Sequence, residues 1–115
     1  MLKSYSFTKS SRLLKKAQFD FVFKSAKRLA QPAFTVLTRP NQLDYPRLGL
    51  IIAKKTAKKA VHRNRVKRIT RETFRLNQHD LPNVDIVVLS KKGISEIDSI
   101  ELFKQLEKIC AKLKK

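Results

Sequence analysis

Positive charge and a helical pattern of apolar residues coincide in residues 54–75, KKTAKKAVHRNRVKRITRETFR. The segment holds ten of the chain's 27 lysines and arginines and a single acid, Glu72. Projection of residues 60–76 at about 100° per residue gathers the apolar and threonine side chains on one side, with two more at its edges. The one-sided set is Val66, Ile69, Thr70 and Thr73, and the edges carry Phe74 and Leu76. The pattern predicts a helix with one face on a core and one in solvent.

The solvent face of this expected helix is a continuous cationic ridge. Its members are Asn64, Lys67, Arg68, Arg71 and Arg75, flanked by Arg63 and Arg65. A merely solvated helix usually interleaves acids with bases, because pairs at i, i+4 relieve repulsion. Guanidinium groups instead grip phosphate oxygens with two parallel hydrogen bonds. We therefore expect a nucleic acid to dock here, and not an acidic membrane, for which the apolar face is too narrow.

Four lysines surround the expected start of the helix. Lys54 and Lys55 follow an expected strand, and Lys58 and Lys59 immediately precede the helix. They either extend the docking surface towards the helix N-terminus, which favours phosphate, or serve solubility alone. Both interpretations stay open at the level of sequence.

Composition limits the class of protein. A chain of 115 residues with 42% hydrophobic residues suits one domain, residues 1–115, whose first ten residues we expect to be flexible. A net charge of +18 makes an anionic partner favourable. Cys110 is the only cysteine and His62 and His79 the only histidines, so we expect neither an internal disulfide nor a metal site. Without an apolar run for a signal peptide or membrane span, the chain is interpreted as cytoplasmic and free of membranes.

The remaining pattern predicts an α+β fold, a mixed α/β sandwich. Residues 15–26 read as a helix with Phe19, Val22, Phe23 and Ala26 on one face. Residues 34–39 and 47–53 read as strands, joined as a hairpin through the turn-rich residues 41–46. Residues 84–89 predict a strand buried on both faces. Residues 99–112 predict a helix capped by Asp98 or Ser99, with the stripe Ile100, Phe103, Leu106 and Ile109. The order is helix, strands, basic helix, strand, helix.

The basic segment also carries a recognisable order of residues. Lys54 and Lys55, a short spacer, and then R-N-R-x-K-R-x-x-R-x-x-F from Arg63 to Phe74 resemble the signature of the protein subunit of bacterial ribonuclease P. Arg12 and Leu13 resemble that family's N-terminal R-L pair, and Phe19 and Phe23 its two helix aromatics. The resemblance covers nearly the whole chain.

The resemblance implies a division of labour in which a large RNA is the catalyst. This ribonucleoprotein removes the 5′ leader from precursor tRNA by endonucleolytic cleavage, so no catalytic residue is expected in the protein. The residues expected to contact the catalytic RNA are Lys54, Lys55, Arg63, Asn64, Arg65, Lys67, Arg68 and Arg71. Mg²⁺ is expected in the holoenzyme, held mainly by RNA, with the protein aiding its use and broadening substrate recognition. One protein monomer is expected per RNA.

The same resemblance implies a cleft for the single-stranded leader between the first helix and the sheet. Its expected lining is Arg12, Phe19 and Phe23, with Phe34 and Ile52 as candidates for the floor. From the residues alone, Phe19 and Phe23 suit either a core or a base-stacking platform. A sheet of about four strands with three helices and a left-handed crossover is also implied. Two positions depart from common family patterns: residues 56–59 lack a glycine, and Leu37 stands where a tyrosine is frequent.

Two other classes of function compete with this interpretation. A ribosomal-type RNA-binding protein or RNA chaperone shares the composition, and only the motif and the aromatic helix argue against it. A nuclease with its own active site is weakly supported, because the acids are scattered and His62 lacks a positioned acidic partner.

Overall fold

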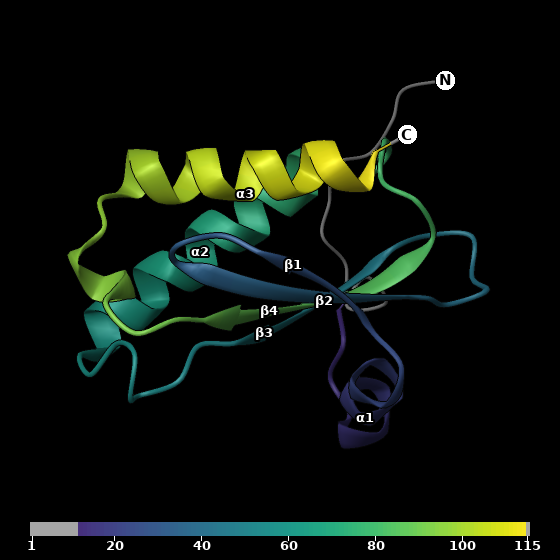
Figure 1. The fold of residues 1–115 in the computed structure, drawn as a ribbon, viewed down its shortest axis with the longest axis horizontal. Coiled ribbons are helices and arrows are strands. Elements are labelled where there is room, and N and C mark those ends of the chain that lie inside the picture. Colours follow the sequence, from purple (N-terminus) through teal and green to yellow (C-terminus); the bar gives the residue numbers. More distant parts are fainter. Residues whose placement is uncertain (1–11, 115) are drawn as a thin grey trace.

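The computed structural model describes residues 12–114, so the expected flexibility of residues 1–10 lies outside the described part (Figure 1). The elements, in chain order, are α1 (Lys16–Lys24), β1 (Lys27–Ala30), β2 (Phe34–Pro40), β3 (Arg47–Ile51), α2 (Ala60–Asn77), β4 (Val84–Ser90), the short 3₁₀ helix η2 (Ile94–Glu96) and α3 (Ser99–Leu113). The predicted α+β class, with three α-helices and a mixed sheet of four strands, is confirmed. No helix in the described residues is long and apolar enough to cross a membrane.

The strand order is β1-β2-β4-β3, so the predicted hairpin between residues 34–39 and 47–53 is wrong. β4 lies between these two strands, antiparallel to β2 and parallel to β3. The reason lies in β4 itself: four consecutive buried residues from Asp85 to Val88 need a neighbouring strand on each side and cover on both faces. The hairpin that does form joins β2 to β1, a short charged strand that the sequence pattern did not reveal. α2 connects the parallel pair, and the left hand expected for that crossover stays a prediction.

The sheet has two unequal faces. α2 and α3 cover one face, and the short α1 crosses the other (Figure 1). Phe34 and Val36 of β2 pack on the helical side with Ile86 and Val88 of β4 and Phe74 of α2, in the main core. A smaller core forms under α1 from Leu13, Val22 and Val87. Since α1 has only nine residues, it covers one end of its face and leaves the rest open.

The predicted orientation of α2 is confirmed. Val66, Thr70, Thr73 and Phe74 are buried, whereas Leu76 at the edge is 46% exposed. The two buried threonines donate their hydroxyl protons to backbone carbonyls one turn earlier, Thr70 to Val66 and Thr73 to Ile69, both at 2.8 Å. These bonds satisfy the hydroxyl groups inside the core.

The predicted stripe of α3 is wrong at its N-terminal end. Ile100 and Phe103 are 70% and 40% exposed, whereas Leu106 and Ile109 are buried as expected. The buried set is Leu102, Gln105, Leu106, Ile109, Cys110 and Leu113. A spacing of three residues falls about 60° short of a full turn at each step, so a strict i+3 series leaves the buried face. The helix start is confirmed, because the Asp98 carboxylate accepts the Glu101 N–H at 2.8 Å.

Cys110 reports on opening of the main core. Its side chain is fully buried, and that burial raises the pKa of the thiol to about 12. The folded pKa lies above the unfolded value, so this group's contribution to stability is present below about pH 8.5 and is lost as pH rises towards 12. We expect Ellman's reagent to label Cys110 at pH 8 only through opening, with a rate that falls as stability rises. Immediate labelling, as in urea-unfolded protein, would contradict this burial.

Candidate nucleic-acid interface

The outer surface of α2 carries the ridge that the sequence predicted. Asn64, Arg68 and Arg71 are exposed and Lys67 is half-buried. Glu72, the helix's only acid, is engaged by Arg75, whose Nε and Nη2 lie 3.1 and 2.5 Å from its oxygens. The hydrogen bond from Arg75 lowers the pKa of Glu72, which therefore stays ionised and paired. Within residues 12–114, no carboxylate forms an ion pair with Lys67, Arg68 or Arg71.

Arg63 and Arg65 hold neighbouring loops in addition to flanking the ridge. Arg63 Nη1 donates to the carbonyls of Ala57 at 3.0 Å and Lys58 at 2.7 Å, which fixes the loop before α2. Arg65 donates to Ser99 Oγ at 3.3 Å and to the Ser95 carbonyl at 3.4 Å. A guanidinium has five N–H donors, so each arginine keeps donors for a ligand. The two side chains therefore orient the surface as well as charging it.

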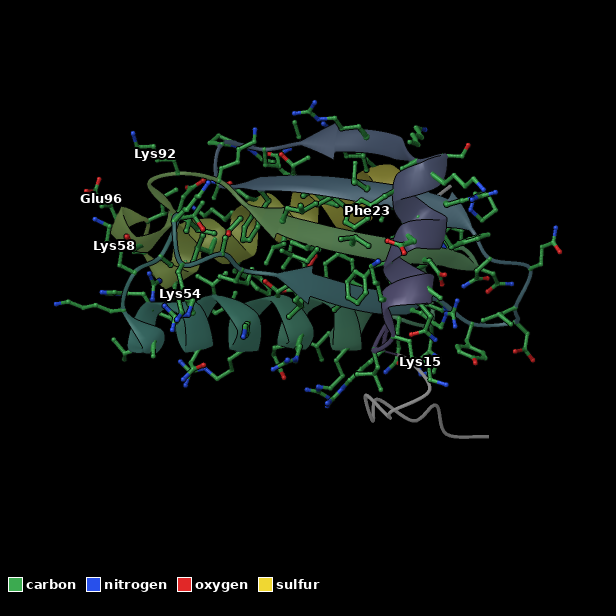
Figure 2. The ribbon with its side chains drawn as sticks, turned by 90° about the horizontal axis from the view of Figure 1, so that it is seen from below. Lys15, Phe23, Lys54, Lys58, Lys92 and Glu96 are labelled. Carbon is green, nitrogen blue, oxygen red and sulfur yellow. The ribbon has the colours of Figure 1, made fainter. Side chains whose placement is uncertain are left out.

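The loop lysines gather at one end of the molecule. Lys54 and Lys58 lie there with Lys92 from the loop after β4, and Glu96 is nearby (Figure 2). A hollow of about 470 Å³ is lined by Lys55, Thr56, Lys58, Lys59, His62, Lys92, Gly93, Ser95 and Glu96. The glycine-free spacer turns at Thr56, whose hydroxyl donates to the Ala53 carbonyl at 2.9 Å. The loop lysines that were expected to extend the ridge therefore lie close together in space.

Arg12 lies beside the ridge. It forms a parallel bridge with Leu48 at the free edge of β3 and lines a hollow of about 130 Å³ with Lys67 and Arg71. The structure thus brings Arg12 together with the ridge, and its role in the cleft with the helix aromatics stays a prediction. The bridge pairs the backbone of Arg12 with the edge strand, and the shared hollow places its side chain next to α2.

The second candidate surface is the open part of the sheet beside α1. Phe19 is half-buried against the sheet, while Phe23 is 45% exposed and lies on the side of α1 towards the uncovered strands (Figure 2). Arg39 holds the helix in place, because its Nη1 donates to the Phe21 carbonyl at 2.6 Å and its guanidinium lies 3.8 Å from the Phe21 ring centre. One aromatic ring thus anchors α1, and another is available to a ligand.

Phe34 and Ile52 do not form the floor of this surface. They are 0% and 8% exposed and belong to the main core under α2 and α3. Side chains alternate along a strand, so the neighbouring residues take the open face. Those residues are Thr35, Leu37, Ile51 and Leu89, all half-buried. The alternation in residues 34–39 separates Thr35 and Leu37 from Phe34 and Val36, but the packing of the helices decides which of the two sets lies on the open face.

Gly49 allows Phe19 to approach the sheet. A Cβ at position 49 would lie 2.5 Å from Phe19 Cε1 and 3.0 Å from Leu13 Cβ. Gly49→Ala is therefore expected to displace the ring and to cost about 1–3 kcal/mol, the usual range for overpacking. Urea unfolding followed by circular dichroism measures this loss. The matched control is Gly49→Ala combined with Phe19→Ala, where the clash with the ring is absent and much of the added cost should vanish. Strictly additive losses would contradict this packing.

The described residues hold no group of three or more histidine, cysteine, aspartate or glutamate side chains placed to bind a metal ion. The charge of the surface suits polyanions, while the aromatic and aliphatic side chains of the open face suit unstacked bases. The fold and its surfaces together define a small α+β domain with a cationic helix facing solvent and an apolar sheet face partly uncovered.

Comparison with known proteins gives the family. A family model described as Ribonuclease P matches residues 7–114. The ribonuclease P protein component of Pectobacterium atrosepticum is 51% identical over 104 residues, which cover 90% of this chain and 87% of that relative. The Staphylococcus aureus RNase P protein superposes with a TM-score of 0.85 at 30% identity, covering 93% and 100% of the two chains. The Thermotoga maritima RNase P protein superposes with a TM-score of 0.78 at 36% identity, covering 90% of this chain and 98% of that one. The chain belongs to the ribonuclease P protein family, and is part of a holoenzyme that acts on precursor tRNA.

Proposed function

We propose that this chain docks on the RNA subunit of ribonuclease P through α2 and its flanking loops, and that this RNA performs the cleavage. The observation that carries the proposal is the uncompensated ridge of Asn64, Lys67, Arg68 and Arg71 on a helix whose opposite face is fixed in the core. Arg12 and the loop lysines Lys54 and Lys55 widen this surface. The protein acts as one monomer per RNA, and RNA phosphates hold the Mg²⁺ used in hydrolysis.

The open sheet face next to α1 receives the 5′ leader of precursor tRNA. Phe23 offers an exposed ring and Leu37, Ile51 and Leu89 an apolar floor. Stacking on a ring is tolerant of sequence, because every base has a π-face. This tolerance suits a subunit that broadens recognition across many different leaders.

The deciding experiment uses precursor tRNA at low Mg²⁺ with three preparations: the protein alone, the ribonuclease P RNA alone, and their mixture. We expect 5′-leader removal in the mixture, little with RNA alone and none with protein alone. The low Mg²⁺ matters because cationic side chains then replace part of the counterion screening between RNA segments. Cleavage by the protein alone would overturn this proposal in favour of a nuclease. A mixture that cleaves no faster than RNA alone would contradict the proposed docking role.

Phe23→Ala should weaken binding of the assembled particle to precursor tRNA by about 1–3 kcal/mol, the contribution of one stacked base. Binding of mature tRNA should not change, since it lacks the leader. The side chain is 45% exposed, so the fold should tolerate the change. The matched control is Ile100→Ala, another exposed apolar residue, which lies on α3 and so on the opposite side of the sheet from the open face (Figure 1). An equal loss for precursor and mature tRNA would contradict the leader assignment.

A further inference from the structure

A hollow of about 260 Å³ lies between α2 and α3, next to the ridge. This α2–α3 hollow is lined by Arg68, Ile69 and Glu72 from α2 and by Ser99 and Phe103 from α3. Phe103 is 40% exposed, whereas Leu102, Leu106 and Ile109 of the same helix are buried. The Phe103 ring is therefore accessible to a ligand that contacts the cationic ridge.

The lining combines groups that recognise different parts of one nucleotide. Phe103 supplies an aromatic ring on which a base can stack, and Ile69 adds aliphatic surface. Arg68 is exposed at the boundary between hollow and ridge, where its guanidinium can hold a phosphate. The carboxylate of Glu72 is paired with Arg75, which offsets its repulsion of RNA. The backbone of a bound RNA would therefore run along the Arg68 side, with its base directed between the helices.

We propose that the α2–α3 hollow binds one unstacked base of the RNA that docks on the ridge, with Phe103 stacking on the base and Arg68 holding the adjoining phosphate. This inference rests on the proposed function. The volume lies just below the range of about 300–1,000 Å³ for pockets that take drug-sized ligands, which suits a single base. Arg65 secures one rim, because it donates to Ser99 Oγ at 3.3 Å and thereby ties α2 to the start of α3.

RNA is favoured over a second copy of the chain for two reasons. First, Arg68 belongs to both the ridge and the hollow, so an RNA on the ridge already reaches the opening. Second, a net charge of +18 opposes association of two copies. A stable protein interface buries about 800 Å² per partner. This region offers two exposed large apolar side chains, Ile100 and Phe103, which are too few to form the core of such an interface.

The chain has no tryptophan, which allows a direct optical test on the full-length protein. Phe103→Trp places one indole in the hollow, and a base stacked on it should quench its emission when ribonuclease P RNA is added. Ile100→Trp is the matched control, since position 100 is exposed on the same helix but does not line the hollow. Heparin, a polyanion without bases, should leave the Phe103→Trp emission unchanged. Equal quenching at both positions, or quenching by heparin, would overturn the stacking.

Binding measurements supply an independent readout. Phe103→Ala should reduce affinity for the RNA by about 5- to 150-fold, as for one stacked base, while the salt dependence stays unchanged because no charge is removed. Arg68→Ala should reduce both the affinity for the RNA and the salt dependence of binding, because it removes a charge. Failure of the wild-type protein to bind this RNA would overturn the proposed function itself. If the wild-type protein binds tightly and Phe103→Ala binds equally well, only the base site is overturned. The base site is also overturned if sedimentation without RNA shows that the wild-type protein self-associates and that Phe103→Ala does not.

Discussion

Arg47→Ala should lower the free energy of unfolding by about 3–5 kcal/mol, the usual cost of removing one partner of a buried ion pair. The pair joins the first residue of the edge strand β3 to the neighbouring strand β4, where Arg47 Nε and Nη2 donate to the two carboxylate oxygens of Asp85 at 2.8 and 2.6 Å. This hydrogen bond raises the pKa of the guanidinium. Asp85 is fully buried, and Asn41 Nδ2 at 3.0 Å would be its remaining side-chain donor. The loss follows from leaving a buried carboxylate without its cation.

A paired replacement separates this cause from a general loss of packing. Arg47→Met combined with Asp85→Leu removes both charges and keeps apolar volume, so the double variant should recover much of the stability. Arg28→Ala is the surface control, since Arg28 is exposed on the edge strand β1, and it should change stability by no more than about 0.5 kcal/mol. Urea unfolding followed by circular dichroism measures all three. A double variant less stable than Arg47→Ala would show that the ion pair itself is required.

The pairing of Asp85 could not be predicted from the sequence pattern. The apolar run of residues 84–89 predicted a strand buried on both faces, and β4 is one. The pattern could not show that an arginine from β3 neutralises the acid within it, because that pairing depends on which strands are adjacent. The hairpin prediction failed for the same reason: chain proximity favoured joining β2 to β3, whereas the core places β4 between them.

Local periodicity was reliable where one period dominated. α2 was predicted over residues 60–76 and extends from Ala60 to Asn77, because a single apolar side coincides with the 3.6-residue repeat. α3 contains overlapping apolar series, and only packing against α2 and the sheet selects the one that includes Leu102. At the open face, the sequence identified the strand but placed Phe34 on the wrong side of it. An alternating pattern fixes which residues share a face, but not which face a helix will cover.

The ridge of α2 should dominate affinity for RNA. Arg68→Ala combined with Arg71→Ala removes two exposed guanidinium groups that form no ion pair within residues 12–114. Hydrogen bonds to charged groups contribute about 1.5–3 kcal/mol each, so the double variant should bind ribonuclease P RNA roughly 10²- to 10⁴-fold more weakly at low salt. The slope of log K against log salt should become shallower by about 1–2 units. Filter binding across a salt series measures both quantities.

The control for this variant tests whether location or net charge is responsible. Lys108→Ala combined with Lys112→Ala removes the same charge from exposed positions on α3, away from the ridge. Counterion release depends on cations that contact phosphates, so this control should keep nearly the wild-type affinity and slope. Both double variants should unfold at nearly the wild-type urea concentration, because all four side chains are exposed. Equal losses of affinity would mean that the RNA responds to the overall charge, and that the order of residues in α2 does not define the docking surface.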